Sequence, residues 1–386
     1  MKIALLTPGG VDRSGTHRVI PCLLWLLERI AREHEVHVFA LWQEERPCRY
    51  ELLGAQVHNI GRGRTAARTL LALAREHRRA PFHLLHALWA VPAGTLAAAA
   101  GRILRRPVLL QITGGELLDL RDIRYGGCRT IRGRTLVRLA LQGADTIVVP
   151  SEPVRAAAAR LGFEARRLPL GADPRHWPPR PPRPRESGRP ARLIHVASLN
   201  RVKDQPTLLR ALARLAAAGT EFTLDVAGTD TLGGAVQRLA AELGLADRTT
   251  FHGFLPQDRL RTLMERADLL VLASRHEGDP IVLLEAALTG VPTVGTAVGR
   301  IAEWAPDAAS AVPVGDDAAL AREVATLLAD DERRLALAHA AQARALAEDA
   351  DWSAARMLEL YDELAARPRR RTRRPQASAR PRHGLP

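Results

Sequence analysis

Two glutamates eight residues apart, Glu277 and Glu285, are the acidic pair with the most evident chemistry in the sequence. Glu277 lies in a loop after an apolar run, and Pro280 suits the first position of a helix. Glu285 then falls on the next turn or so, so both carboxylates can face one cleft and accept hydrogen bonds from hydroxyl groups. The free N–H groups near Ile281 and Val282 can meet a phosphate. Stabilisation of the helix dipole is the alternative role; it fits Glu277 tolerably, but it fits Glu285, which lies in an apolar stretch, poorly.

A lysine marks a second candidate position. Only Lys2 and Lys203 occur in a chain that otherwise uses arginine. Lys203 and Arg201 lie between a predicted strand and a helix, at the mouth of the expected cleft, where two cations can neutralise a pyrophosphate. A compact ammonium is a point-charge phosphate ligand, whereas a guanidinium suits planar contacts. The scarcity of lysine favours a phosphate ligand over the alternative, a solvated helix N-terminus.

A glycine-rich loop, Pro8–Thr16, follows the first predicted strand and precedes a helix. Glycines there allow backbone N–H groups and the helix N-terminus to approach an anionic group. The pattern is not G-x-G-x-x-G, so the fingerprint of a nicotinamide dinucleotide site is absent. Turn geometry alone would also use these glycines. Both interpretations stay open.

Together these residues resemble the family 4 retaining glycosyltransferases of the GT-B architecture. The resemblance rests on Glu277-x7-Glu285, on Lys203 after a strand, and on the glycine-rich first loop. Pro169–Trp177 is similar to the family's Pro-x-Gly-x-Asp passage into its second domain. The likeness runs from the first strand to the helix that contains Trp352.

The resemblance implies a role for each residue. Lys203 and its basic partner would bind the donor's diphosphate, and Glu285 would hold the hydroxyl groups of the ribose. Glu277 would lie against the transferred sugar near its anomeric carbon, and His86 near the sugar and the acceptor. The remaining expected donor contacts are Gly15 and Thr16 on the phosphates, Phe254 and Leu255 at the base, Arg201, and Gly278, Ile281 and Val282 at the helix start.

Three positions depart from the family pattern. Ala197-Ser198 stands where the family usually has Gly-Arg, so the second phosphate cation is either Arg201 from a shifted position or missing. Arg300 follows Gly299 where a second glycine is common, and it could crowd or recharge the donor pocket. Asp279 replaces a usual aromatic residue.

The elements that must position these residues are those of parallel α/β sheets, because short apolar runs alternate with helical patterns. The expected fold class is two Rossmann-like, doubly wound parallel-sheet domains that face a cleft, where ligands bind at the carboxyl ends of the strands. The strands predicted in the first half are 2–6, 35–39, 57–60, 82–85, 108–112, 145–149 and 164–168. Those predicted in the second half are 193–197, 222–227, 249–253, 269–273, 293–295 and 311–314. The predicted organisation is an acceptor-side domain, 1–173; a solvated Pro/Arg-rich linker, 174–190; a nucleotide-sugar donor domain, 191–350; a helix that packs back toward the first domain, 351–366; and a disordered basic tail, 367–386.

The formal net charge of +14 would suggest a nucleic-acid or anionic-membrane partner. Twelve of those charges belong to the linker and the tail, and the rest of the chain is nearly neutral. The arginine runs lack interleaved aromatic residues for base stacking, so we expect no specific nucleic acid. Weak association of the tail with an anionic membrane is the expected partner contact beyond donor and acceptor.

Composition also limits cofactors and location. The three cysteines are widely spaced and form no C-x-x-C, so neither a disulfide framework nor a zinc site is predicted. No Asp-x-Asp-type cluster is evident for Mg²⁺, so we expect no metal and no cofactor besides the nucleotide-diphosphate sugar as co-substrate. The first apolar run is too short for a signal sequence. The expected location is the cytoplasm, or the inner face of the membrane.

The predicted activity is retaining transfer of a hexosyl group from a nucleotide-diphosphate sugar to an acceptor hydroxyl, on a glycan, a lipid-linked molecule or a small molecule. One alternative is a sugar-nucleotide epimerase or hydrolase of the same fold, which would consume donor without acceptor. The other is a basic membrane- or polyanion-binding protein with a vestigial site, which would depend on the tail.

Overall fold

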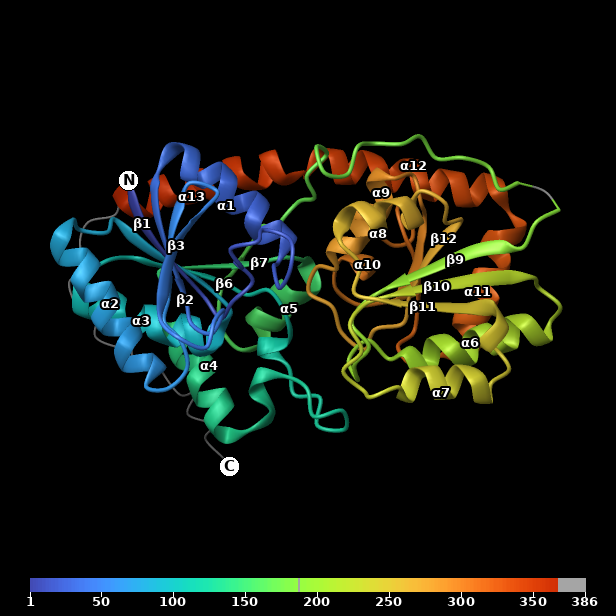
Figure 1. Ribbon diagram of the computed structural model, residues 1–386, viewed down its shortest axis with the longest axis horizontal. Coiled ribbons are helices and arrows are strands. Elements are labelled where there is room, and N and C mark those ends of the chain that lie inside the picture. Colours follow the sequence, from blue (N-terminus) through green and yellow to red (C-terminus); the bar gives the residue numbers. More distant parts are fainter. Residues whose placement is uncertain (187, 367–386) are drawn as a thin grey trace, which may run out of the picture.

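The computed structural model describes residues 1–186 and 188–366, which form two α/β domains side by side (Figure 1). The first domain has an eight-stranded sheet and the second a six-stranded sheet. In spatial order the first sheet contains β3 (Cys48–Leu52), β4 (Ala55–Asn59), β2 (Glu35–Ala40), β1 (Lys2–Thr7), β5 (Leu84–Leu88), β6 (Val108–Gln111), β7 (Thr146–Val149) and β8 (Arg166–Arg167). The second contains β11 (Thr249–Gly253), β10 (Phe222–Ala227), β9 (Ala191–Val196), β12 (Leu269–Leu272), β13 (Thr293–Thr296) and β14 (Ser310–Val312). Both orders are doubly wound, as predicted.

Helices cover both faces of each sheet. In the first domain these are α1 (Pro21–Glu33), α2 (Thr65–Arg79), α3 (Thr95–Leu104), α4 (Ile131–Gly143) and α5 (Glu152–Arg160). In the second they are α6 (Gln205–Ala217), α7 (Ala235–Glu242), α8 (Gln257–Met264), α9 (Ile281–Leu288), α10 (Gly299–Trp304), α11 (Asp317–Ala329) and α12 (Asp331–Ala347), followed by α13 (Ala350–Ala366).

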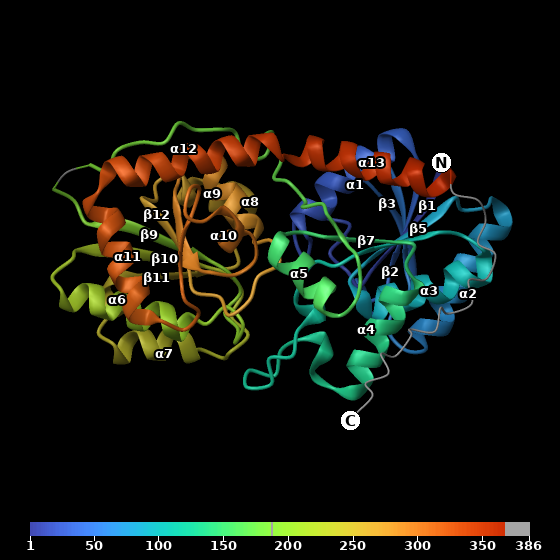
Figure 2. The same ribbon diagram turned by 180° about the vertical axis from the view of Figure 1, so that it is seen from behind.

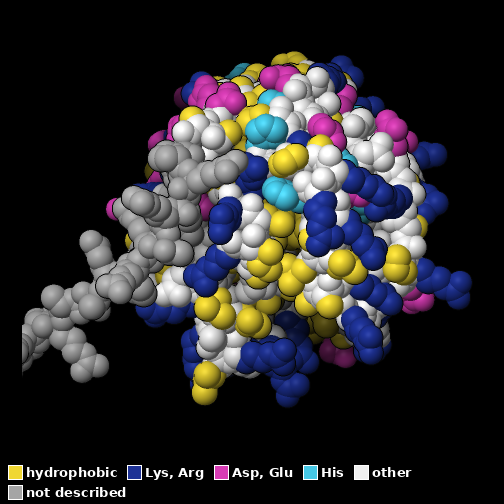
Figure 3. Space-filling view, turned by 90° about the vertical axis from the view of Figure 1, so that its left-hand side faces the viewer, with side chains coloured by type: hydrophobic (Ala, Val, Ile, Leu, Met, Phe, Trp, Pro, Cys, Tyr) yellow, Lys and Arg dark blue, Asp and Glu magenta, His cyan; other side chains and the backbone are white. Residues whose placement is uncertain are grey.

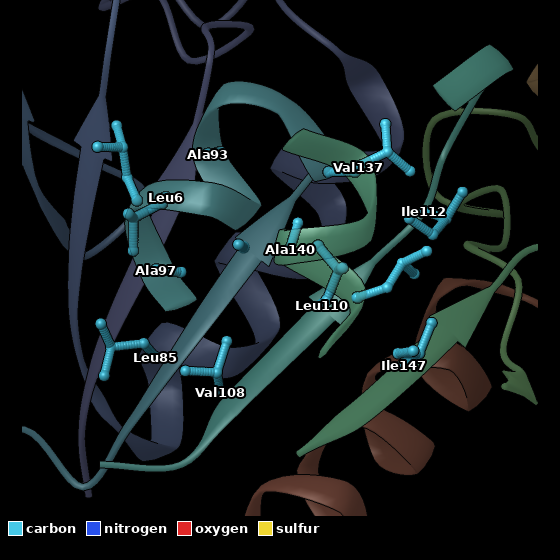
Figure 4. Close-up of a cluster of buried hydrophobic side chains, with 14 of the residues drawn as sticks. Leu6, Leu85, Ala93, Ala97, Val108, Leu110, Ile112, Val137, Ala140 and Ile147 are labelled. Atoms are coloured by element: carbon cyan, nitrogen blue, oxygen red, sulfur yellow. The ribbon is translucent and has the colours of Figure 1, made fainter. Parts of the chain in front are cut away.

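The strands are continuously apolar because they are buried on both sides. All six residues of β1 and all four of β12 are buried, as expected for parallel strands between two helix layers. Figure 4 shows the core on one face of the first sheet, where Leu6, Leu85 and Leu110 pack with Ala97 of α3 and Val137 of α4. In the second domain, α6, α7 and α11 cover one face of the sheet, and α8, α9, α10 and α12 cover the other.

The chain returns to the first domain after the second sheet is complete. Helices α12 and α13 follow one another along one side of the molecule, α12 over the second domain and α13 over the first (Figures 1 and 2). Met357, Leu360 and Tyr361 of α13 are buried beside α1 in the first domain's core. The last described helix therefore completes the core of the first domain.

The described residues of the Pro/Arg-rich segment, 174–186 and 188–190, run along the second domain and contact it at several points, although most of their side chains are partly or fully exposed. The backbone N–H of Arg180 donates to the carbonyl of Leu288 at 2.9 Å. Arg189 forms an ion pair with the buried Asp268 at 2.8 Å. A proline-rich chain keeps its carbonyl acceptors, and its arginines find carboxylate partners on the adjoining surface. The charge of this segment is therefore partly neutralised by the fold.

Every predicted strand corresponds to an observed one within a few residues, but β3 was not predicted. It is the only antiparallel strand of the described sheets, and it pairs with β4 across the turn Leu53-Gly54. Its inner and outer residues alternate between more and less buried, so it lacks the continuous apolar run of the other strands. The expected disordered tail, 367–386, lies outside the described residues.

Candidate active site between the two domains

The loop between β12 and α9 brings Glu277 to the face between the domains. The Glu277 side chain is buried, and its Oε1 lies 2.6 Å from Nζ of Lys203. The hydroxyl of Ser274 donates to the same carboxylate oxygen, also at 2.6 Å. Glu277 and Lys203 are 74 residues apart in the sequence. The structure thus brings together two residues that were predicted to share one site.

A capped turn after β9 holds Lys203 in place. Oδ1 of Asn200 accepts the N–H groups of Val202 and Lys203, each at 3.2 Å. The backbone N–H of Arg275 donates to the carbonyl of Val202 at 2.7 Å. This bond ties the lysine turn to the loop that carries Glu277. The ammonium and the carboxylate are therefore positioned by backbone contacts as well as by their ion pair.

Helix α9 begins beside this pair with free donors. Pro280 is its N-cap residue, and the N–H groups of Ile281 and Val282 have no acceptor among residues 1–186 and 188–366. That is the ordinary state of a helix N-terminus. Two N–H donors and one ammonium near the same helix start can bind an anionic group.

Glu285 lies further along α9 in an apolar environment. Its side chain is 3 % exposed and has no hydrogen-bond partner in the part of the chain that the structure describes. Burial raises the pKa of Glu285 to about 8, so at neutral pH the carboxyl group can donate a hydrogen bond as well as accept one. Burial, and then the charges of Asp279 and Glu285, raise the pKa of Cys22 to about 12. The start of α1 in the first domain therefore faces α9.

The first domain contributes a loop that sequence reasoning missed. A Cβ on Gly278 would come within 2.6 Å of the carbonyl oxygen of Thr113, and the hydroxyl of Ser151 donates to the carbonyl of Gly278 at 2.8 Å. Gly278 therefore serves the contact between the domains. Buried Glu116 accepts the N–H of Gly114 at 2.7 Å, and burial raises its pKa. Gly114 and Gly115, which follow β6, were the signal in the sequence that could have indicated this loop, just as glycines indicated the loop after β1.

The glycine-rich loop after β1 also reaches the second domain. The rings of His17 and Phe254 have their centroids 5.7 Å apart. The loop that contains Gly15 and Thr16 therefore meets the turn that contains Phe254 and Leu255. The side chains of Thr16 and Phe254 are exposed at this contact.

The base of the same loop is rigid. Oε1 of Gln43 accepts the N–H groups of Gly10 and Val11 at 2.8 and 3.0 Å. Burial alone would raise the pKa of Asp12, but hydrogen bonds from Ser14 and Arg18 lower it to about 2. An anchored base and an exposed tip suit a loop that contacts a ligand bound between the domains.

His86 does not lie in this site, so the prediction that places it near the sugar and the acceptor is wrong. It is fully buried in the middle of β5. Its Nδ1 lies 2.7 Å from the hydroxyl of Tyr361, and its Nε2 lies 3.1 Å from Oε1 of Gln111. Burial lowers the pKa of His86 to about 4. A side chain in mid-strand points into a helix layer rather than to the carboxyl edge of the sheet, and here it fixes α13.

Arg201 is not brought to the Lys203–Glu277 pair. Its side chain is exposed and has no ion pair within the described residues. Lys203, two residues later, turns inward. The role of Arg201 as a second phosphate cation stays a prediction.

The other two departures from the family pattern form one ion pair. Nε of Arg300 lies 2.9 Å from Oδ1 of Asp279, and both side chains are buried. The Arg300 guanidinium also lies 5.8 Å from the ring centroid of Trp304 and 4.0 Å from Glu348. Burial raises the pKa of Asp279 to about 6, although Arg300 opposes the shift. The charge of Arg300 is thus met by Asp279.

Residues 1–186 and 188–366 contain neither a cluster of metal ligands nor a helix suited to cross a membrane. No group of three or more His, Cys, Asp and Glu side chains there could hold a metal ion. No helix in the same residues has the length and the apolar composition to cross a membrane.

Two protein-family descriptions match the chain. "Glycosyl transferases group 1" matches residues 181–344, which include Lys203, Glu277 and Glu285, and "Glycosyl transferase 4-like domain" matches residues 19–171. Among curated proteins, the glycogen synthase of Mycobacterium tuberculosis is 33% identical over 208 residues, which are 53% of this chain and 49% of that protein. The matched stretch thus spans about half the length of that relative.

Solved structures share the whole two-domain arrangement. Sucrose-phosphate synthase from Thermosynechococcus elongatus superposes with a TM-score of 0.80 at 20% identity, over 94% of this chain and 98% of that one. HepE from Anabaena, in complex with UDP-glucose, gives a TM-score of 0.74 at 20% identity, over 94% of this chain and 100% of that one. At this identity the likeness shows the fold, which is GT-B.

Proposed function

The chain belongs to the glycosyl transferases group 1 family, and we propose that it transfers a hexosyl group from a nucleotide-diphosphate sugar to an acceptor hydroxyl. The observation that carries the proposal is the contact between Lys203 and Glu277 at the start of α9, with buried Glu285 further along the same helix. One cation, two free N–H groups and two carboxyl groups suit a ligand that combines a diphosphate with several hydroxyl groups.

The donor would be held by the second domain. Lys203 and the N–H groups of Ile281 and Val282 would meet the diphosphate, and Glu285 would meet the hydroxyl groups of the ribose. A solved structure of similar fold, HepE, was obtained with UDP-glucose, which supports a nucleotide sugar as the donor class. In this arrangement Glu277 lies beside the phosphate site, where it would contact the transferred sugar.

We propose that transfer proceeds with retention of the anomeric configuration and without a metal ion. Breaking the bond between the sugar and the phosphate places negative charge on the departing diphosphate. A preorganised ammonium and helix N–H groups stabilise such charge without reorganisation, and removal of one such donor costs about 10²–10³-fold in rate. The acceptor hydroxyl would enter from the first domain, past the loops that contain Thr16 and Thr113. The acceptor would be a glycan, a lipid-linked molecule or a small molecule.

A thermal-shift panel of UDP-, GDP- and ADP-sugars tests the donor, because a ligand that binds the folded state raises Tm. Transfer is then measured with the stabilising donor and a panel of sugar and lipid acceptors, with and without EDTA, and the product's anomeric configuration is read by NMR. Lys203→Ala and Glu285→Ala should each nearly abolish transfer while the circular dichroism spectrum stays unchanged. Full activity in either variant would contradict the proposal.

Donor consumption separates transfer from the main alternative. A sugar-nucleotide epimerase or hydrolase would consume donor at the same rate with no acceptor present. A transferase should require the acceptor for rapid turnover, and its product should contain the donor's sugar.

A further inference from the structure

Four large apolar side chains are exposed on three neighbouring helices of the first domain. They are Leu71 of α2, at 46% exposure, Ile103 of α3, at 66%, and Ile131 and Leu139 of α4, at 77% and 50%. Helix α3 packs between α2 and α4. The inner sides of these helices cover the first sheet, so their outer sides form one continuous surface, which we call the α2–α4 face.

Arginines surround the apolar side chains on this face. Figure 3 looks onto this end of the molecule and shows hydrophobic and Lys/Arg side chains intermingled over its middle and lower part, with Asp and Glu side chains mainly toward its upper edge. Six exposed arginines lie on or next to the three helices: Arg68, Arg75, Arg78, Arg102, Arg132 and Arg138. None of them forms an ion pair within residues 1–186 and 188–366.

Acidic residues do not balance this charge. The three helices contain a single acid, Glu76. Glu76 is buried, and Arg49 and Arg79 already neutralise it, at 3.1 and 2.9 Å. The near-neutral composition of the folded part therefore hides a local excess of positive charge on one face.

We propose that the α2–α4 face docks on an anionic lipid bilayer. Arginines beside exposed isoleucine and leucine side chains match the two layers of a membrane surface, because the guanidinium groups meet lipid phosphates while the apolar side chains enter the acyl boundary. Helix α4 presents this pattern along its outer side, where Ile131, Arg132, Arg138 and Leu139 are all exposed. Each arginine near an anionic surface adds to the attraction.

Other partners fit this face less well. Two copies of the chain would bring the same unpaired arginines together and repel one another. A nucleic acid would use aromatic side chains for stacking, and α2, α3 and α4 contain no Phe, Tyr or Trp. A soluble polyanion would leave the exposed isoleucine and leucine side chains without a role. The basic tail expected to attract a membrane, 367–386, lies outside the described residues, and no residue of the α2–α4 face belongs to it.

Flotation of the full chain with vesicles tests the proposal, using phosphatidylglycerol with phosphatidylcholine in one set and phosphatidylcholine alone in the other. The charge variant is Arg102→Gln/Arg132→Gln/Arg138→Gln, and the apolar variant is Ile103→Ser/Ile131→Ser/Leu139→Ser. The matched control is Arg210→Gln/Arg238→Gln/Arg322→Gln, which removes three exposed arginines from the second domain. A fourth variant replaces the arginines of the tail, 367–386, by glutamine.

The wild-type chain and the control should bind the anionic vesicles and not the neutral ones. The charge variant should bind about tenfold more weakly or worse, and the apolar variant should also lose binding at physiological salt. Unchanged binding of either variant overturns the proposal, and so does loss of all binding when only the tail is changed. If the wild type binds heparin as tightly as it binds vesicles, and the apolar variant binds heparin equally well, the face would be assigned to a soluble polyanion instead. If sedimentation shows a dimer for the wild type and a monomer for the apolar variant, the face would be assigned to a second copy of the chain.

Discussion

The carboxylate of Glu277 and the ammonium of Lys203 neutralise each other at a distance of 2.6 Å. Under the proposed function, a diphosphate that binds Lys203 would have to compete with Glu277 for the ammonium. Glu277 is also held by Ser274, so it can remain in the site after it loses the lysine. In the proposed site, the pair would couple binding of the diphosphate to release of a carboxylate beside the transferred sugar.

This coupling predicts opposite effects of Glu277→Gln on binding and on transfer. The amide cannot neutralise Lys203, so a free nucleoside diphosphate should bind about tenfold more tightly, as expected for release of one partly buried charge pair. Transfer should fall, because the carboxylate is lost. Calorimetric titration with UDP, GDP and ADP measures the first effect, and steady-state rates measure the second. Weaker nucleotide binding by Glu277→Gln would show that the pair does not compete with phosphate.

Burial of Glu285 predicts a stability change with pH. Its pKa is raised from 4.5 to about 8, so the folded state binds a proton that the unfolded state releases between these values. The stabilising effect of protonation is complete below pH 4.5 and is lost as pH rises toward 8. Between pH 4.5 and pH 7, the buried position of Glu285 lowers the free energy of unfolding by about 3 kcal/mol.

The variant Glu285→Gln should escape this cost. The unfolding free energy of Glu285→Gln minus that of the wild type should increase steadily between pH 5 and pH 8, and this difference should level off above pH 8. Urea unfolding at four pH values measures it, with Glu323→Gln, a partly exposed carboxylate on α11, as the control. A difference that does not change with pH would show that Glu285 is ionised in the folded protein.

At the scale of elements, the Asp279–Arg300 pair links the start of α9 to α10. The three guanidinium nitrogens of Arg300 are buried and have no hydrogen-bond partner within the described residues, so the ion pair is their main compensation. Removal of one partner of a buried pair costs about 3–5 kcal/mol, whereas replacement of both by apolar residues is often neutral.

A double-mutant cycle therefore predicts strong coupling between these two elements. Asp279→Leu should destabilise the chain by about 3 kcal/mol or more, and Asp279→Leu/Arg300→Met should recover most of that loss. Unfolding free energies from urea titration of Asp279→Leu, Arg300→Met and the double variant complete the cycle. Additive losses in the double variant would mean that the two side chains act independently.

Elements were predictable where one physical rule decides them. Buried parallel strands such as β1 and β12 are continuously apolar, so their positions follow from the sequence. The edge strand β3 depends on its partner β4 and on a two-residue turn, and its residues alternate between partly buried and exposed instead of forming a continuous apolar run. Elements stabilised by pairing rather than by their own apolar runs give the weaker signal.

Site residues were predictable where local spacing brings them together. Glu277 and Glu285 share a loop and a helix, and Lys203 stood out by its rarity. His86 was misplaced because its position within β5 could not show which side of the sheet it faces, or that Tyr361 from α13 would cover it. The loop at Thr113 needed the domain contact with Gly278 before it could be recognised.

At the scale of the whole molecule, buried histidines lie in both domains. Burial lowers the pKa of His58, His86 and His195 to about 4 from an ordinary value of 6.5. As the pH falls, these histidines take up protons at a higher pH in the unfolded chain than in the folded chain. The stability they contribute is complete above pH 6.5 and is lost as pH falls toward 4. Glu285 acts in the opposite sense, since its protonation favours the folded state.

Each histidine should contribute about 2 kcal/mol to the loss of unfolding free energy between pH 7 and pH 4.5. His86→Gln keeps a polar group between Tyr361 and Gln111 but cannot be protonated, so its pH dependence should be weaker than that of the wild type by that amount. His17→Gln, an exposed histidine change in the loop after β1, is the matched control. Urea unfolding at pH 7, 6, 5 and 4.5 compares the three proteins. Because His86 holds α13 and α13 completes the first domain, equal slopes for His86→Gln and wild type would mean that acid opens the α13 contact before the domain unfolds.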